Sequence, residues 1–112
     1  MAQLRRYNRI YKGDNQVLSY KADYINDIEH FNSMDVRWYL AITKRHLPSI
    51  IKSNYEGNVV FEDGQIKVHL SPFDTEKLLD DVYYYEIEAS EDIDHIITRE
   101  VGKIYVHDTL TG

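Results

Sequence analysis

Histidine and carboxylate side chains are the groups of this chain best suited to acid–base or metal chemistry. The 112 residues include 19 Asp and Glu and five histidines, namely His30, His46, His69, His95 and His107. Enzymes that use such groups show short, recognisable spacings, for example two His four residues apart on a helix, a Gly-x-Ser-x-Gly turn or a glycine-rich phosphate loop. None of these spacings occurs in the sequence. We therefore predict that the chain is not an enzyme and holds no cofactor.

One alternative arrangement of these groups is a metal site at the end of the chain. His107 and Asp108 are adjacent, and Glu91 or Asp92 would have to complete the ligand set. A solvated strand end explains the same pair without a metal, and this is the interpretation we prefer. We expect no catalytic and no metal-binding residues.

The charge of the chain argues against nucleic acid as a partner. The formal net charge is -6 and the sequence pI is about 5.2, whereas phosphate-backbone binding needs a basic surface. One basic segment, LRRYNRIYK, opens the chain, with Arg5, Arg6, Arg9 and Lys12 interleaved with Tyr7 and Tyr11. It is either a solvated arm, which we favour, or a contact for an acidic partner.

Cysteine and long apolar segments are both absent from the sequence. Neither disulfides nor thiolate metal sites can hold the fold. No apolar run approaches the roughly 20 residues that cross a bilayer, and the N-terminus lacks the apolar core of a signal peptide. We expect no membrane partner and synthesis in the cytoplasm.

Period-two alternation of apolar and polar residues predicts a succession of β-strands. It is clearest in IKVHL, where Ile66, Val68 and Leu70 share one face. In VRWYLAIT it places Trp38 in the core with its apolar neighbours. We predict strands over Leu4–Tyr11, Val17–Ile25, Val36–Thr43, Val59–Phe61, Ile66–Leu70, Tyr83–Ala89 and Ile97–Val106.

The segments between these strands carry turn and helix signals. Glu62–Gln65 predicts a hairpin turn with Gly64 at positive φ. Ser71-Pro72-Phe73-Asp74 predicts a capped helical turn. Asn26–Asp35 is expected to be turn-like, and Lys44–Gly57 an exposed connection. In that connection Ile50 and Ile51 either cap the core, our preferred interpretation, or contact a partner.

Tyr83 resembles the tyrosine corner of immunoglobulin-like sandwiches, in which a Tyr at the start of a late strand bonds back to the backbone. Tyr85 then stands where antibody domains carry a cysteine, and Trp38 packs across the sandwich. The predicted fold is all-β, an immunoglobulin-like antiparallel β-sandwich of about seven strands with one short helical turn. Residues 1–11 form an N-terminal strand or arm, and 12–112 form a single β-sandwich domain.

Several of these signals recur in one order in a known family. Asp74-Thr75, Leu78, Tyr83, Tyr85, Thr98, Gly102 and Val106, preceded by the turn Lys12-Gly13-Asp14-Asn15, resemble small structural proteins of tailed bacteriophages. A related domain begins the upper baseplate proteins of some phages of Gram-positive bacteria. The resemblance implies a virion component, as a head fibre, capsid decoration, tail or baseplate protein. It also implies a homo-oligomer, which we expect to be a trimer or hexamer, in contact with other virion proteins.

A carbohydrate- or peptide-binding module is the alternative function. Ten tyrosines are many for a chain of this length, and Tyr is common both in strands and in contact surfaces. The candidate contact residues are Arg5, Arg6, Tyr7, Arg9, Tyr11, Ile50, Ile51, Tyr55 and Tyr84, and a host surface glycan is a possible ligand. Trp38, Tyr83, Tyr85 and Gly102 are the predicted structural residues.

Overall fold

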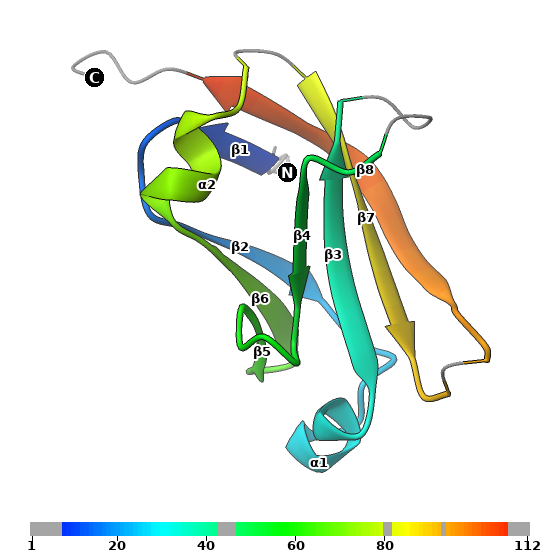
Figure 1. Ribbon diagram of the computed structural model, residues 1–112. Helices are drawn as coiled ribbons and strands as arrows, with labels where there is room; N and C mark the ends of the chain where they lie inside the picture. The colour runs from blue at the N-terminus through cyan, green and yellow to red at the C-terminus, as the bar shows by residue number, and fades with distance from the viewer. Residues whose placement is uncertain (1–7, 43–46, 80–81, 93, 108–112) are drawn as a thin grey trace, which may run out of the picture.

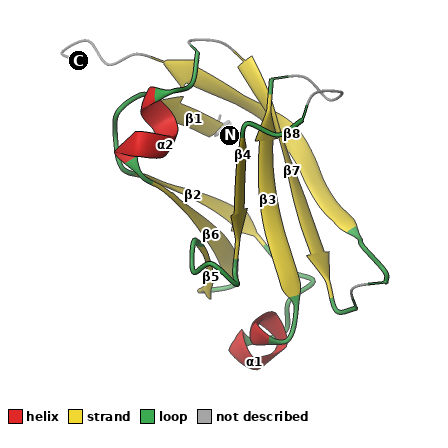
Figure 2. Ribbon diagram, viewed as in Figure 1, coloured by secondary structure: helices red, strands yellow, loops and turns green. Residues whose placement is uncertain are grey.

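The computed structural model describes residues 8–42, 47–79, 82–92 and 94–107. These residues form eight strands and two short helices (Figures 1 and 2). The strands are β1 (Asn8–Tyr11), β2 (Gln16–Lys21), β3 (Asp35–Ala41), β4 (Ile50–Ser53), β5 (Val59–Glu62), β6 (Gln65–Leu70), β7 (Val82–Ser90) and β8 (Thr98–His107). The helices are α1 (Ile28–Asn32) and α2 (Pro72–Glu76), and they lie at opposite ends of the sheets (Figure 1).

The strands form two sheets, with the order β1-β8-β7-β3-β4 in one and β2-β6-β5 in the other. β1 runs parallel to β8, and the remaining pairs are antiparallel. In the immunoglobulin arrangement strands B, E and D form one sheet, while G, F, C and C′ form the other. β2, β6 and β5 match the first set in order, and β8, β7, β3 and β4 match the second. The predicted all-β, immunoglobulin-like sandwich is confirmed.

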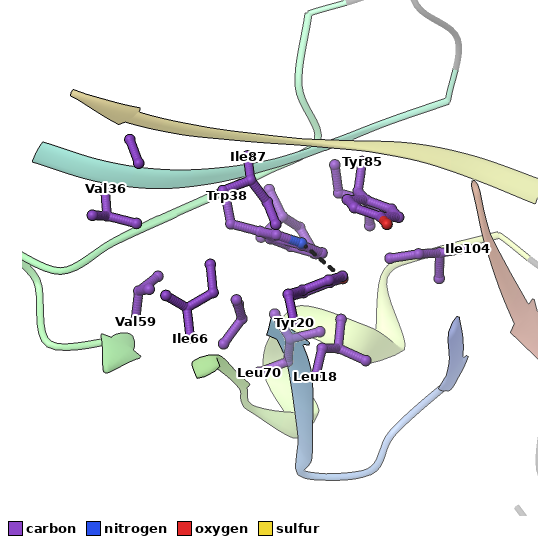
Figure 3. Close-up of a cluster of buried hydrophobic side chains, with 14 of the residues drawn as sticks. Leu18, Tyr20, Val36, Trp38, Val59, Ile66, Leu70, Tyr85, Ile87 and Ile104 are labelled. Atoms are coloured by element: carbon purple, nitrogen blue, oxygen red, sulfur yellow. Dashed lines mark hydrogen bonds between the residues drawn. The ribbon is translucent and has the colours of Figure 1, made fainter. Parts of the chain in front are cut away.

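The core lies between the sheets and is built from alternate residues of the long strands. Alternate residues within β2, β3, β6 and β7 are buried as predicted, whereas Tyr24 and Ile42, which continue the predicted inward faces beyond the ends of β2 and β3, are only partly buried. Figure 3 shows side chains of both sheets meeting in this layer, among them Leu18 and Ile66 from the smaller sheet and Val36 and Ile87 from the larger. The alternation of the sequence therefore decides which side chains remain outside.

A polar and aromatic contact joins the two sheets at the centre of the core. The fully buried Trp38 donates a hydrogen bond from Nε1 to the hydroxyl of Tyr20 at 3.1 Å (Figure 3). The rings of Tyr20 and Tyr85 lie 4.9 Å apart between centroids. Tyr20 is on β2 and Tyr85 on β7, the strands that a disulfide joins in antibody domains. Burial raises the pKa of Tyr20 far above its usual value, so its hydroxyl stays neutral.

Gly102 of β8 lies opposite Tyr85 in the register and leaves room for its ring. A Cβ on Gly102 would come within 2.5 Å of a carbon of that ring. The Tyr85 hydroxyl reaches along β8 and donates to Glu100 at 2.5 Å. Gly102 is thus required by close packing, since its φ is not in the left-handed region.

The tyrosine corner that the sequence predicts is present. The Tyr83 hydroxyl accepts a hydrogen bond of 2.9 Å from the backbone N–H of Leu79, four residues upstream. The predicted cap of α2 is also present: Asp74 N–H donates to the Ser71 side chain, and Ser71 N–H donates back to the Asp74 carboxylate. These two contacts fix the path of the chain from β6 into β7.

Two predicted connections were wrong, because each contains a short element. The segment 44–57 includes β4, which pairs with the outer edge of β3. The segment 26–35 includes α1, whose first turn is capped by the Asp27 side chain accepting from His30 N–H. The described residues consequently hold eight strands and two helical turns, where about seven and one were expected.

Tyr83→Phe tests the tyrosine corner. The substitution removes the acceptor of the Leu79 N–H and keeps the ring, which is 3% exposed. We expect the free energy of unfolding to fall by about 1–2 kcal/mol, measured by urea denaturation. Tyr55→Phe, at a ring that is 71% exposed, is the control. A loss no larger than that of the control would contradict the structural role of this bond.

Candidate functional site

The outer face of the five-stranded sheet gathers the aromatic and charged side chains that point away from the core. Register places Ile51, Tyr39, Glu86 and Val101 in one row across β4, β3, β7 and β8. The next row contains Ala41, Tyr84 and Lys103. We call the surface made by these seven residues the outer face. Val101 is 60% exposed and Ile51 is 49% exposed.

A hollow of about 570 Å³ lies over the middle of the outer face. Backbone and side-chain atoms of β3, β7 and β8 form its floor, and the loop between β3 and β4 adds Pro48 to its wall. The lining residues are Tyr39, Ala41, Pro48, Tyr84, Tyr85, Glu86, Glu88, Val101, Gly102 and Lys103. Its size and its aromatic walls are those of a surface that can take a ligand or a partner side chain.

Two neighbouring carboxyl groups dominate the electrostatics of the hollow. Burial, followed by a hydrogen bond with Glu88 and the charge of Glu88, raises the pKa of Glu86. The Tyr39 hydroxyl donates to Glu88 at 3.0 Å, and burial together with this carboxylate raises the pKa of Tyr39. The nearby Arg37 is held on Asp35 by contacts of 3.0 and 3.2 Å. The like-charged pair therefore lies beside neutral aromatic groups.

The structure places the predicted contact residues in three different environments. Tyr84 and Ile51 belong to the outer face, and the exposed Arg9 and Tyr11 lie on β1 at the edge of the same sheet. Tyr55 is 71% exposed in the turn after β4, whereas Ile50 is buried at 5% and faces the core. Arg5, Arg6 and Tyr7 lie outside the described residues.

The described members of the alternative metal set are not brought together, and Asp108 lies outside the described residues. Glu91 and Asp92 precede β8 and His107 ends it, so about 30 Å of strand separates them. Glu91 instead contacts Nε2 of His30 at 2.6 Å, and His30 Nδ1 accepts from the N–H of Asn26. Among the residues that the structure describes, no three His, Asp or Glu side chains are close enough to share a metal ion. In that same part of the chain, no helix has the length and hydropathy needed to cross a bilayer.

Sequence reasoning identified some of these groups and missed others. Alternation on β7 already placed Tyr84, Glu86 and Glu88 outward. It did not identify Tyr39, Val101 and Lys103 as their neighbours, because the sequence of a single strand does not determine which strands lie beside it in the sheet. Tyr39 lies between the core residues Trp38 and Leu40, and this alternation was the signal that its side chain faces outward.

Two comparisons with known proteins were negative. A scan against models of protein families finds no match, and a search of curated proteins finds no matching chain. The class of protein is thus defined by the fold, an all-β immunoglobulin-like sandwich with an aromatic and acidic hollow on its larger sheet.

Glu86→Gln tests the electrostatics of the hollow. Because the pKa of Glu86 is raised on folding, the folded chain binds this proton more tightly than the unfolded chain does. Stability therefore falls as pH rises from about 4.3, the ordinary pKa of Glu, through the raised value. The variant removes the titrating group, so for the dilute, monomeric chain we expect its melting temperature to exceed that of the wild type at about pH 7 and to approach it near about pH 3.

Thermal melts across this range provide the measurement, with Glu56→Gln in the exposed turn after β4 as the matched control. Parallel profiles for Glu86→Gln and the wild type would show that Glu86 titrates normally.

Proposed function

We propose that this chain is a non-enzymatic structural protein of a tailed-bacteriophage particle, in which it serves as a head fibre, capsid decoration, tail or baseplate component. It assembles through protein–protein contacts with other virion proteins and with copies of itself. The observation that carries the proposal is the outer face, where Ile51 and Val101 are exposed and the Tyr39 and Tyr84 side chains are half-buried on the larger sheet of a small sandwich.

Two of the segments that carry the phage resemblance are in direct contact. The Gly13 N–H donates to the Thr75 hydroxyl at 2.9 Å, and that hydroxyl lies 3.1 Å from the Asp14 carbonyl oxygen, to which it donates. Thr75 is fully buried. Two motif segments about 60 residues apart in sequence are thus joined by hydrogen bonds, which supports interpreting them as one structural unit of a scaffold.

The outer face suits assembly better than catalysis. A contact surface needs exposed aromatic and apolar groups with few charges at its centre. Tyr84, Val101 and Ile51 provide such groups, and the charged residues that line the hollow are Glu86, Glu88 and Lys103. We expect such a surface to be covered in the working particle.

An antiserum raised against the purified chain tests the proposal on phage particles purified by density gradient from the source culture. We expect the chain to sediment with the particles and the antiserum to label one part of them in electron micrographs. Recovery of the chain exclusively from the unassembled fraction would contradict a virion role.

A carbohydrate- or peptide-binding module is the second candidate, and the hollow favours it. Tyr39 and Tyr84 offer aromatic surface, and Glu86 and Glu88 offer acceptors for hydroxyl or amide donors. For this function we expect a hit in a glycan screen whose affinity falls at least about tenfold in Tyr84→Ala, with Tyr55→Ala as the control. Equal binding by both variants would exclude the hollow as the glycan site.

A further inference from the structure

We propose that the outer face binds the outer face of a second copy about a two-fold axis that runs along the line from Tyr84 to Val101, and that Lys103 of each copy pairs with Glu86 of the other. This inference rests on the proposed assembly function and names its first partner and contact surface.

Four outer-face residues form a small quadrilateral on β7 and β8. Tyr84 is directly opposite Lys103, and Glu86 is directly opposite Val101. Tyr84 and Glu86 are two residues apart on one strand, as are Val101 and Lys103 on the other, so all four point to the same side. The uncharged residues therefore occupy one diagonal, and the opposite charges occupy the other.

This pattern is complementary to itself. A two-fold axis in the plane of the contact, along the Tyr84–Val101 diagonal, brings each residue of that diagonal near its own copy. The same operation brings each Lys103 close to the partner's Glu86 position, and the two ion pairs that result are identical. Self-complementarity of one patch is the requirement for an isologous contact.

The charges of the quadrilateral are not neutralised within the described residues, although Glu86 also forms side-chain hydrogen bonds with Glu88 and Thr98. Within the described residues, neither Glu86 nor Lys103 forms an ion pair, and the neighbour of Glu86 on β7 is another carboxyl group. Arg37, on the same side of the sheet, is already engaged by Asp35. A second copy supplies an ammonium group at this place and covers Val101, which is 60% exposed.

The face is also large enough for a stable contact. The strands β1, β8, β7, β3 and β4 contribute 4, 10, 9, 7 and 4 residues, which at about 3.3 Å per residue and about 4.8 Å between strands span roughly 540 Å² in projection. Side-chain relief adds accessible area, which brings the face close to the approximately 800 Å² that each partner buries in an interface of standard size.

Charge exchange tests the pairing in the purified chain by light scattering coupled to size exclusion, from about 10 µM to about 500 µM. We expect the wild type to form a dimer through this contact, in place of the trimer or hexamer that the phage resemblance implies. Lys103→Glu and Glu86→Lys should each weaken it by about 100-fold or more, because each places two pairs of like charges in contact. The double variant should recover to within about tenfold of the wild type. Lys21→Glu, an exposed lysine on β2 of the other sheet, makes the same charge change and should not alter the dimer.

Cysteine cross-linking tests the axis independently of charge, since the chain has no native Cys. The axis places the two Val101 side chains near each other, so mild oxidation of Val101→Cys should give a covalent dimer on a non-reducing gel. Ser19→Cys, on β2 of the other sheet, should remain a monomer on that gel. Circular dichroism of every variant checks that the sandwich has formed.

Three outcomes would overturn the inference: a wild-type monomer at the highest concentration, an oligomer with an odd number of copies, or a dimer that Lys103→Glu and Lys21→Glu affect equally. These results are independent of the particle experiment. A monomer that still sediments with particles would contradict the two-fold contact and support the virion role. A dimer that is absent from particles would support the two-fold contact and contradict the virion role.

Discussion

The contact of Trp38 with Tyr20 and Tyr85 is the interaction on which the rest of the structure depends. Because the chain has no cysteine, this cluster holds the two sheets together at the place where antibody domains use a disulfide. A Trp N–H and a Tyr hydroxyl buried without partners would each cost about 1–3 kcal/mol, and bonding them to each other removes that cost. With Trp38 and Tyr85 inside, the pleat of β3 and β7 forces Tyr39, Tyr84 and Glu86 outside. The outer face is therefore a consequence of the core.

Gly102 transmits this constraint from β7 to β8. The ring of Tyr85 occupies the space that a Cβ on residue 102 would need, and its hydroxyl bonds to Glu100 on the same strand. A slip of one residue between β7 and β8 would place a side chain against that ring and would turn Lys103 and Val101 toward the core. The position of Lys103 next to Tyr84, and of Val101 next to Glu86, is thus set by packing on the opposite side of the sheet.

Alternation in the sequence predicted the inward faces of β2, β3, β6 and β7, and short-range signals predicted the Ser71 cap and the Tyr83 corner. These features depend on residues close together in the chain. β4 was missed because four residues with one inward isoleucine, Ile50, show too little alternation, and its existence depends on pairing with β3. α1 was missed because a five-residue helix has no measurable helical period. Tyr20 lies on the inward face of β2, but its hydrogen bond with Trp38 joins two sheets and has no local signature in the sequence. For the same reason the outward residues of β7 could be named while their neighbours on β3 and β8 could not.

Among the described residues, neither carboxyl group of the hollow forms an ion pair. Burial, together with the hydrogen bond and charge of Glu88, raises the pKa of Glu86, so the ionised form of Glu86 opposes folding in the isolated chain. Tyr39 relieves part of this through its bond to Glu88, but a phenol carries no positive charge. Unfavourable groups in folded proteins concentrate at sites that bind or react. A positive group brought by a partner would convert this local cost into binding energy, and it would do so at the point where the exposed apolar residues of the face converge. The same arrangement serves a solitary sandwich poorly, which is why we regard the larger sheet as a surface built to be covered.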